Sequence, residues 1–344
     1  MDDRGEVLWR RHASRRLPNA STTKMATALR VVSDQDYDPD DVVVVSAHAA
    51  ATGGGGLDLE AGDAYTAGEL LYALLLSSSN DASVALAEYS AGEEQPFVAG
   101  MNRLADRLGA SSTRFVTPHG LDAPGHYSTA RDLAVLGEAT LDDPVLAPIV
   151  ETPRITVAGP RGPELVENRN LLLETYRGAI GVKTGFTAGA GNVLVGAAIR
   201  HERRIVAVAM RSDDAAADAR RLLDYGFHRL SRSVIVARGQ TVGELVLDSG
   251  GSTLAVARRA VRGWARPEDV RLEFLPAATI TMPVAPGEPV GEVELQGASG
   301  YVAAVPAAAT EAVSSDDSSW MQTAFATALR WGYETAAMAG AGEP

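Results

Sequence analysis

Two lysines stand out in this sequence because it contains no others. Of its 31 basic residues only Lys24 and Lys183 are lysines, and the rest are arginines. Lys24 ends the tetrapeptide Ser-Thr-Thr-Lys that begins at Ser21. If a helix starts at Ser21, the two side chains lie one turn apart on the same face. A neutral lysine can take the proton of a serine hydroxyl, so the pair predicts Ser21 as the nucleophile that attacks an amide carbonyl and Lys24 as its base.

Two further polar sets follow in the chain. Ser78-Ser79-Asn80 lies between two apolar segments, a position from which a loop can project polar groups into a cleft. Lys183-Thr184-Gly185 precedes a β-rich run, so we expect it on a strand. There Lys183 would supply positive charge, Thr184 a hydroxyl, and Gly185 room for close approach of a ligand to the backbone.

Helices packed on an antiparallel sheet are expected to position these residues, which makes the fold α+β. Hydrophobic periodicity and turn residues predict a hairpin around the polar turn His-Glu-Arg-Arg. The predicted helices cover 21–33, 67–76, 82–89, 97–108, 129–141 and 215–227, and the predicted strands cover 5–9, 42–46, 193–199 and 205–210.

The pattern of residue types along the chain changes near residue 234. Short β-branched runs recur between glycine, proline and aspartate turns, the pattern of a small all-β domain. A polar linker follows at 314–319, and from Trp320 apolar residues fall on one face of an amphipathic helix. We therefore expect a catalytic domain at 1–232, a β-rich domain at 233–313, and a linker and helix at 314–344. That helix either packs on its own protein or touches a membrane surface through 320–332.

Composition narrows the functional classes. The chain has 344 residues and a net charge of −13, which argues against nucleic acid as a partner. It has no cysteine, so disulfides and cysteine-ligated zinc are excluded. No run of about eighteen apolar residues predicts a membrane-spanning helix. Residues 1–11 show no charged segment followed by an apolar run, so no signal peptide is expected.

The ordered set S-x-x-K, S-x-N and K-T-G is shared by β-lactamases and penicillin-binding proteins. The chain resembles the serine-type D-alanyl-D-alanine carboxypeptidases, the low-molecular-mass penicillin-binding proteins of bacterial cell walls. The resemblance extends from about residue 4 to 310 and includes PNASTTKMATAL, LLYALLLSSSNDASVALAE, FVTPHGLDAPGHYSTARDLA, GVKTGFTAGAG and RRLLDYGF. It implies a penicillin-binding or β-lactamase-like domain, with a helical subdomain, followed by a small all-β domain.

The resemblance also implies a role for each matching residue. Ser21 would be acylated, Lys24 would be its base, Ser78 would relay a proton to the leaving group, and Lys183 would assist that relay. Asn80 would hold the substrate amide, although a helix cap is its simpler role. Thr184 and Arg169 would recognise the terminal carboxylate, although Arg169 by itself reads as one surface arginine among many. The backbone N–H groups of Ser21 and Phe186 would form the oxyanion hole.

The implied substrate is the peptidoglycan stem peptide ending in D-Ala-D-Ala, and β-lactams would be covalent inhibitors. The resemblance implies no metal or organic cofactor and an extracytoplasmic location. Two features depart from the family. Ser79 stands where glycine is usual, and the first strand is short, with only its second half (GEVLW) present.

Three alternatives stay open on the sequence. A class A β-lactamase would need a glutamate to activate the deacylating water, and Glu167 is the nearest candidate. A metallopeptidase is disfavoured because the six histidines form no H-E-x-x-H pair. A non-catalytic cell-wall scaffold with a truncated catalytic domain is the alternative from a different class.

Overall fold

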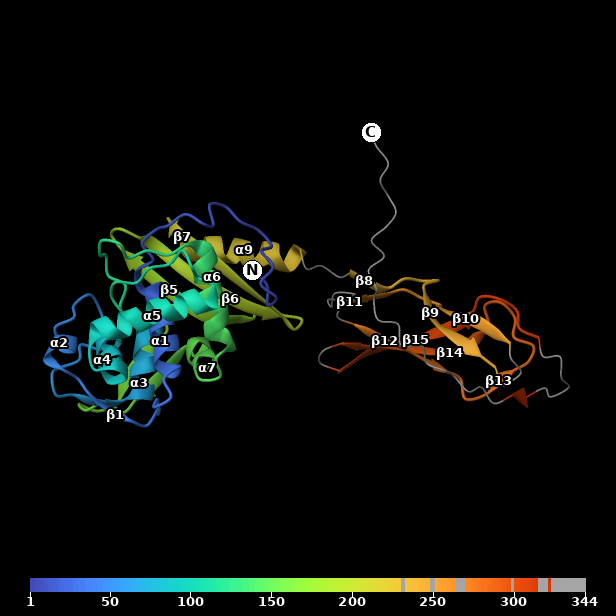
Figure 1. The fold of residues 1–344 in the computed structure, drawn as a ribbon, viewed down its shortest axis with the longest axis horizontal. Coiled ribbons are helices and arrows are strands. Elements are labelled where there is room, and N and C mark those ends of the chain that lie inside the picture. Colours follow the sequence, from blue (N-terminus) through green and yellow to red (C-terminus); the bar gives the residue numbers. More distant parts are fainter. Residues whose placement is uncertain (230–232, 248–250, 264–269, 298–299, 315–320, 323–344) are drawn as a thin grey trace, which may run out of the picture. The chain divides into compact units, whose positions relative to one another are not determined.

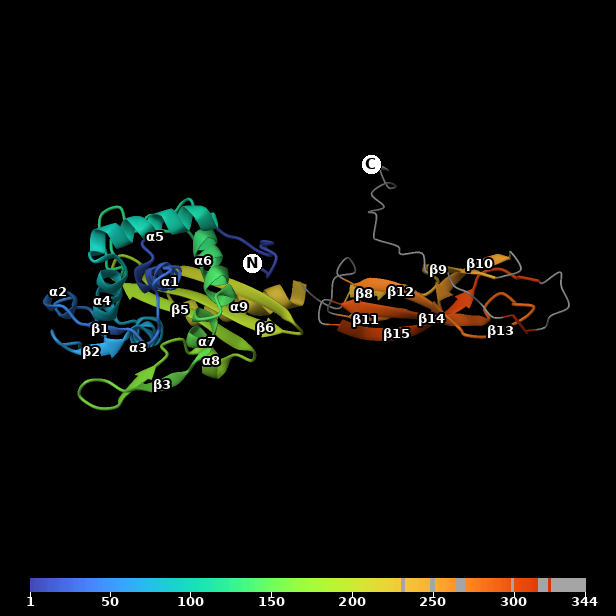
Figure 2. The same ribbon diagram turned by 60° about the horizontal axis from the view of Figure 1, so that its bottom comes forward.

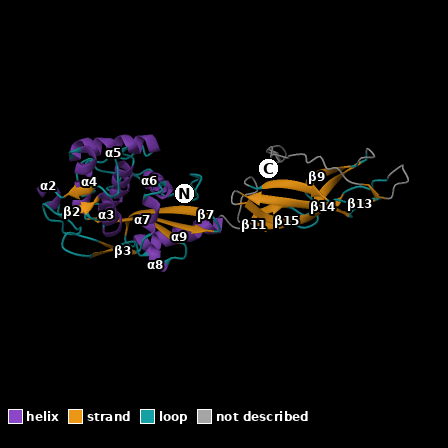
Figure 3. Cartoon of the chain, turned by 90° about the horizontal axis from the view of Figure 1, so that it is seen from below, coloured by secondary structure: helices purple, strands orange, loops and turns teal. Residues whose placement is uncertain are grey.

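The chain divides into two units, Met1–Arg229 and Leu230–Pro344 (Figure 1). The computed structural model describes residues 1–229, 233–247, 251–263, 270–297, 300–314 and 321–322. The first unit contains both helices and strands, whereas every regular element described in the second unit is a strand (Figure 3). The predicted α+β class, with an all-β part after it, is confirmed.

An antiparallel sheet of three strands in the order β5-β6-β7 forms the centre of the first unit. Two helices cover its opposite faces, and Figure 2 shows α6 lying across it. A Cβ atom on Gly137 of α6 would meet Val195, whereas one on the neighbouring sheet residue Gly196 would meet Leu172 and, at 3.6 Å, Ala219 of α9. These five elements are β5 Ala179–Thr187, β6 Gly191–Arg200, β7 Arg203–Ser212, α6 Ala130–Asp142 and α9 Ala215–Arg229.

A helical subdomain stands beside the β5 end of this sheet. Its core is made of alanine, leucine and methionine side chains from α1, α3, α4 and α5, most of which are fully buried. The elements of this part are η1 Ala20–Thr22, α1 Thr23–Val32, β1 Val42–Val44, α2 Ala47–Ala50, β2 Ala64–Thr66, α3 Ala67–Tyr72, a π-helix Ala73–Ser77, α4 Asn80–Ala91 and α5 Glu94–Leu108. The connections to the sheet hold α7 Leu146–Glu151, β3 Arg154–Val157, β4 Glu164–Glu167 and α8 Leu172–Thr175.

The helix predicted at 67–76 is shorter than expected and changes type. It starts with a capping box in which Thr66 and Glu69 bond reciprocally to each other's backbone. After Tyr72 the chain widens into a π-helix up to Ser77. Ser78 then takes a left-handed conformation with φ 69°. This wide turn, which periodicity alone does not reveal, directs the S-x-N segment out of the helix axis.

The strand predicted at 5–9 is wrong. The carboxylate of Asp2 accepts hydrogen bonds from the backbone N–H groups of Arg4 and Glu6, and Gly5 has φ 78°. This turn bends the chain, so its pairing with the sheet stays at residues 1–3, through a bridge between Asp2 and Ile205 of β7 and backbone hydrogen bonds between Met1 and Val206.

The second unit is built on a five-stranded antiparallel sheet in the order β12-β14-β15-β10-β9. Alternating valine, leucine and alanine side chains form its own buried core. The strands are β8 Ser233–Val236, β9 Thr241–Val246, β10 Ser252–Ala257, β11 Val261–Gly263, β12 Arg271–Pro276, β13 Ile280–Thr281, β14 Pro289–Gly297, β15 Gly300–Ala309 and β16 Met321–Gln322.

Most of the amphipathic helix predicted from residue 320 lies outside the described residues. At Met321–Gln322, which are described, the chain forms a short strand paired with β13 and not a helix. Membrane contact through 320–332 therefore stays a prediction. No helix in the described ranges combines the length and apolar character needed to cross a membrane.

Candidate active site

The Ser21–Lys24 pair is in hydrogen-bonding contact. Lys24 Nζ lies 2.8 Å from Ser21 Oγ, 2.6 Å from Asn80 Oδ1 and 2.8 Å from the carbonyl oxygen of His119. The last two atoms can only accept hydrogen bonds. A neutral lysine would use its two N–H groups on them and turn its lone pair to the Ser21 hydroxyl. The geometry is therefore that of a base aimed at a nucleophile.

The surroundings of Lys24 favour this neutral form. The side chain is fully buried, and loss of solvation lowers its pKa well below the ordinary value of 10.5. The positive charges of Lys183 and Arg169 lower the pKa further. Desolvation and nearby like charge both disfavour a charged amine.

Ser21 is presented by a short 3₁₀ turn, so α1 begins at Thr23 and not at the predicted Ser21. Ala20, just before Ser21, has a left-handed backbone with φ 48°. The Ser21 backbone also lies against β5, because a Cβ on Gly185 would stand only 3.0 Å from Ser21 N. Gly185 thus allows the turn that carries Ser21 to approach the strand, whereas the sequence predicted close approach of a ligand there.

Asn80 connects the second motif to Lys24. It is the first residue of α4, and its side chain makes no cap, so the helix-cap alternative does not apply. Its Oδ1 accepts from Lys24, and its Nδ2 donates to Gly53 O at 2.9 Å. A Cβ on Gly54 would lie 2.8 Å from Nδ2. The loop of four glycines at Gly53–Gly56 therefore packs closely on the Asn80 side chain.

Ser78 lines the cleft and is 6% exposed. Its position depends on Asp81, a buried carboxylate that accepts from Ser79 Oγ and from Leu59 N. These bonds fasten the turn after the π-helix to the loop opposite. Ser79, where the family usually has glycine, therefore contributes a hydrogen bond to this turn.

Lys183 lies on β5 as predicted, paired with Val195 of β6. It is 1% exposed, and burial followed by the charge of Arg169 lowers its pKa from 10.5 to about 7. Its Nζ donates to the carbonyl of Thr184 at 3.1 Å. Near neutral pH this amine is poised between its charged and neutral forms.

A cleft of about 450 Å³ opens over these groups. Lys24, Asn80 and Lys183 are almost wholly buried and are not among the residues that line the cleft. Lys24 contacts Ser21 and Lys183 contacts the carbonyl of Thr184, and both of these partners line the cleft. Phe186 at its rim is 67% exposed. The predicted residues that line the cleft directly are Ser21, Ser78, Arg169, Thr184, Gly185 and Phe186.

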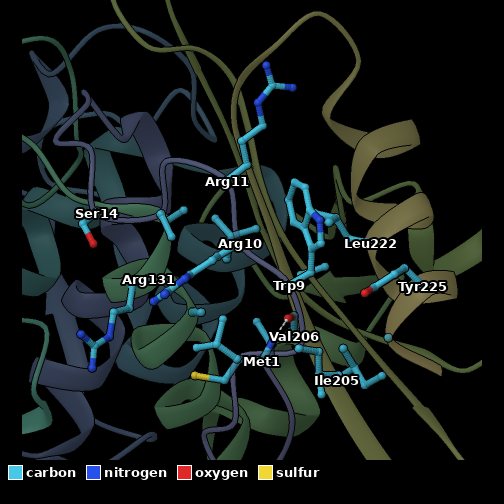
Figure 4. A pocket seen from close by; sticks show the side chains of 18 residues that line it. Met1, Trp9, Arg10, Arg11, Ser14, Arg131, Ile205, Val206, Leu222 and Tyr225 are labelled. Atoms are coloured by element: carbon cyan, nitrogen blue, oxygen red, sulfur yellow. Dashed lines mark hydrogen bonds between the residues drawn. The ribbon is translucent and has the colours of Figure 1, made fainter. Parts of the chain in front are cut away.

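A second hollow lies at the other edge of the sheet (Figure 4). It has a volume of about 300 Å³ and is lined by side chains of β7, α6, α9 and the first residues of the chain. The Met1 amine donates to Val206 O at 2.7 Å beside it. None of the predicted site residues lines this hollow, so we assign the chemistry to the cleft at β5.

The competing enzyme classes find no support in the described residues. Glu167, the glutamate considered for a β-lactamase, is exposed on β4 and is absent from the residues that line the cleft. Within the described ranges, no cluster of three or more histidine, aspartate or glutamate side chains could hold a metal.

Several supporting groups were not predicted from the sequence. The carbonyl of His119 orients Lys24, and Asp81 holds the turn of Ser78. Asp122 binds the far end of β5 through Thr187 Oγ1 at 2.7 Å and Gly189 N at 2.9 Å. His119 and Asp122 both belong to the run PHGLDAPGHYS, whose density of glycine and histidine is a usable signal in the sequence.

The fold and the cleft together define an active-site serine acyl-transfer enzyme of the penicillin-binding type. Comparison with known proteins identifies the family. The sequence profile of the D-alanyl-D-alanine carboxypeptidases matches residues 1–214. The chain belongs to the D-alanyl-D-alanine carboxypeptidase family.

Individual curated proteins that are similar to this chain carry the same family name. D-alanyl-D-alanine carboxypeptidase DacF of Bacillus subtilis is 31% identical over 322 residues, covering 90% of this chain and 83% of the relative. DacB2 of Mycobacterium tuberculosis is 41% identical over 213 residues, covering 60% of this chain and 71% of the relative. Among solved structures, a Streptomyces DD-transpeptidase superimposes with a TM-score of 0.64 at 30% identity, covering 66% of this chain and 95% of that one.

Similarity of fold extends further along the chain. The D-alanyl-D-alanine carboxypeptidase DacD of Francisella tularensis matches with a TM-score of 0.64 and covers 92% of both chains at 24% identity. The β-rich second unit is thus part of an architecture seen in a solved structure.

Proposed function

We propose that this protein removes the terminal D-Ala from peptidoglycan stem peptides through an acyl-enzyme on Ser21. The supporting observation is the buried Lys24 amine, 2.8 Å from Ser21 Oγ and held by two acceptor oxygens. A serine without such a base is a weak nucleophile. The substrate class is taken from the names of the relatives. The cleft provides the hydroxyl of Ser21 for attack on an amide, and Thr184 and Arg169 for binding a carboxylate.

In the acylation step Ser21 Oγ transfers its proton to Lys24 and forms a bond to the carbonyl carbon of the penultimate D-Ala. The N–H groups of Ser21 and Phe186 would stabilise the oxyanion. The C–N bond then breaks, and Ser78 gives its proton to the departing amine of the terminal D-Ala, assisted by the charge of Lys183, while Lys24 returns to Ser78 the proton that it took from Ser21. Asn80 would hold the substrate amide beside Lys24.

Deacylation uses water as the acceptor. Water adds to the acyl carbon, the bond to Ser21 Oγ breaks, and the serine recovers its proton. If an amine replaced water, the product would be a cross-linked peptide. One structural relative is named a DD-transpeptidase. Whether water or an amine accepts the acyl group in this protein is therefore to be measured separately.

Ser21→Ala tests the proposal. The parent protein is expected to gain the mass of one penicillin when incubated with that β-lactam, whereas the alanine variant gains none. The parent should also release D-Ala from an acylated peptide ending in D-Ala-D-Ala. Equal labelling of both proteins would remove Ser21 as nucleophile, and a parent that stays unlabelled while folded by circular dichroism would favour the scaffold alternative.

Arg169 is proposed to bind the substrate carboxylate together with Thr184. Arg169 is exposed at the cleft, and its positive charge lowers the pKa of both buried lysines. Arg169→Ala is expected to raise KM for the D-Ala-D-Ala peptide by roughly 10- to 100-fold, since a charge-assisted hydrogen bond is lost. A matched peptide with a C-terminal amide is the control, because the parent and the variant should process it equally slowly. A KM that the substitution leaves unchanged would contradict the assignment.

The location of this activity is proposed to be the cell wall outside the plasma membrane, where the substrate occurs. The proposal rests on the family and on assembled peptidoglycan, which lies outside the plasma membrane. Release of D-Ala from purified peptidoglycan, and not from a free dipeptide alone, would support it.

A further inference from the structure

A buried polar cluster lies directly behind the nucleophile and takes part in no step of the proposed reaction. Thr23 Oγ1 lies 2.8 Å from His126 Nε2 and receives a hydrogen bond of 2.7 Å from Asn19 Nδ2. Asn19 and Thr23 are fully buried, and His126 is 5% exposed. These residues bracket the turn that carries Ser21.

The His126 ring is fixed in orientation and in tautomer. The backbone N–H of Val116 donates to Nδ1 at 3.1 Å, so Nδ1 carries no proton. Burial lowers the pKa of His126 to about 4, which keeps the ring neutral and leaves the proton on Nε2. Nε2 must therefore donate to Thr23 Oγ1. The ring also meets Phe115 edge-on, with centroids 5.8 Å apart.

Hydrogen bonds hold the chain segments next to His126 in place. Asn102 of α5 holds both backbone groups of Phe115, at 2.8 Å and 3.0 Å. Arg114 and Tyr127 exchange two backbone hydrogen bonds of 2.8 Å and 3.0 Å. A chain of contacts therefore connects α5 through Phe115 and the His126 ring to Thr23 in the first turn of α1.

The turn needs such support because its backbone is unfavourable. Ala20 is left-handed at φ 48°, a conformation that non-glycine residues keep only when their surroundings impose it. Asn19 Oδ1 has no partner among the described residues, so the side chain of Asn19 depends on Thr23. Loss of the Thr23 hydroxyl would leave two further buried polar atoms unpaired.

We propose that His126 is a positioning residue that holds the Ser21 turn in its reactive geometry through the hydroxyl of Thr23. This inference rests on the proposed function, since it concerns the rate at which Ser21 is acylated. His126 is not among the residues that line the cleft, and its hydrogen bonds go to Thr23 and Val116. Its effect is on the position of Ser21 Oγ relative to Lys24 and to the oxyanion donors, for which small displacements are costly.

A double-mutant cycle tests the inference. His126→Leu and Thr23→Val each remove one side of the hydrogen bond and are expected to lower kcat for D-Ala release roughly 10- to 100-fold with KM little changed. Combined, they should be no slower than the slower single variant, because both break the same contact. His126→Gln, which can still donate to Thr23, should recover most of the rate.

Ser128→Ala is the matched control. It removes a partly buried hydrogen bond of the same length, 2.8 Å to Thr113 Oγ1, from the neighbouring chain segment. It should lower Tm comparably and leave kcat near the parental value. Effects that multiply in the double variant, or that track Tm in all five variants, would overturn the inference. A parent that releases no D-Ala at all would instead refute the proposed function.

Discussion

Replacement of Lys24 by methionine is expected to lower the rate of Ser21 acylation by about 10³-fold or more while the protein stays folded. Methionine matches the length of the buried stem but has no lone pair to take the serine proton. The substitution also removes an amine whose burial is unfavourable, so stability should not fall by much. The measurement is the time course of covalent penicillin binding, followed by mass.

Lys24→Arg separates base catalysis from simple positive charge. Arginine stays protonated in proteins, so it can supply charge but cannot accept the Ser21 proton. If Lys24 is the base, the arginine variant is as slow as the methionine variant. An arginine variant that keeps most of the parental rate would show that charge alone suffices and would contradict the assignment.

The same assignment fixes the direction of the pH dependence. A base must be deprotonated, so acylation by the parent should rise as pH passes upward through the Lys24 pKa. Burial and the charges of Lys183 and Arg169 hold that pKa well below 10.5, and the rise should therefore be complete before strongly alkaline pH. Arg169→Ala removes one of these charges and should shift the rise to higher pH.

The sequence was most informative where chemistry and periodicity coincide. The motif lysines, the hairpin of β6 and β7, and the change to short strands after residue 234 all follow from local patterns. Long apolar helices were also predictable in kind, because burial on one side imposes a period close to 3.6 residues. Thus the α+β class and the residues gathered at the cleft could be inferred from residue types and their spacing.

What could not be predicted depends on contacts between distant segments. The carbonyl of His119 reaches Lys24 across 95 positions of sequence, and backbone carbonyls leave no residue-type signature. The π-helix before Ser78 and the left-handed Ala20 are choices imposed by tertiary packing, against local propensity. The strand expected at 5–9 failed for a local reason, since the side chain of Asp2 captures the backbone that a strand would need.

Lys183→Met is expected to abolish most activity and yet to stabilise the protein. The folded chain buries an amine whose pKa is lowered from 10.5 to about 7. Such a shift means that folding disfavours the charged form, by about 4 kcal/mol at neutral pH. Methionine fills the same space without this cost, although the hydrogen bond to Thr184 O is lost. A net gain of about 3 kcal/mol in the free energy of unfolding is therefore expected near pH 7.

The pH dependence of that gain identifies its origin. Between about pH 7 and 10.5 the unfolded parent binds more protons at this lysine than the folded parent, so the stability of the parent rises with pH. The methionine variant lacks this group and should show no such rise. Its advantage should be complete below about pH 7 and should vanish near pH 10.5, as measured by urea unfolding of both proteins.

Two other outcomes would contradict this origin. An advantage that is constant across this range would attribute the gain to packing, whereas a less stable variant would show that the charge of Lys183 is compensated in the folded protein. The expected loss of the advantage with rising pH would mean that the fold gives up stability to keep a titrating amine beside the cleft. That is the behaviour of a group retained for its chemistry.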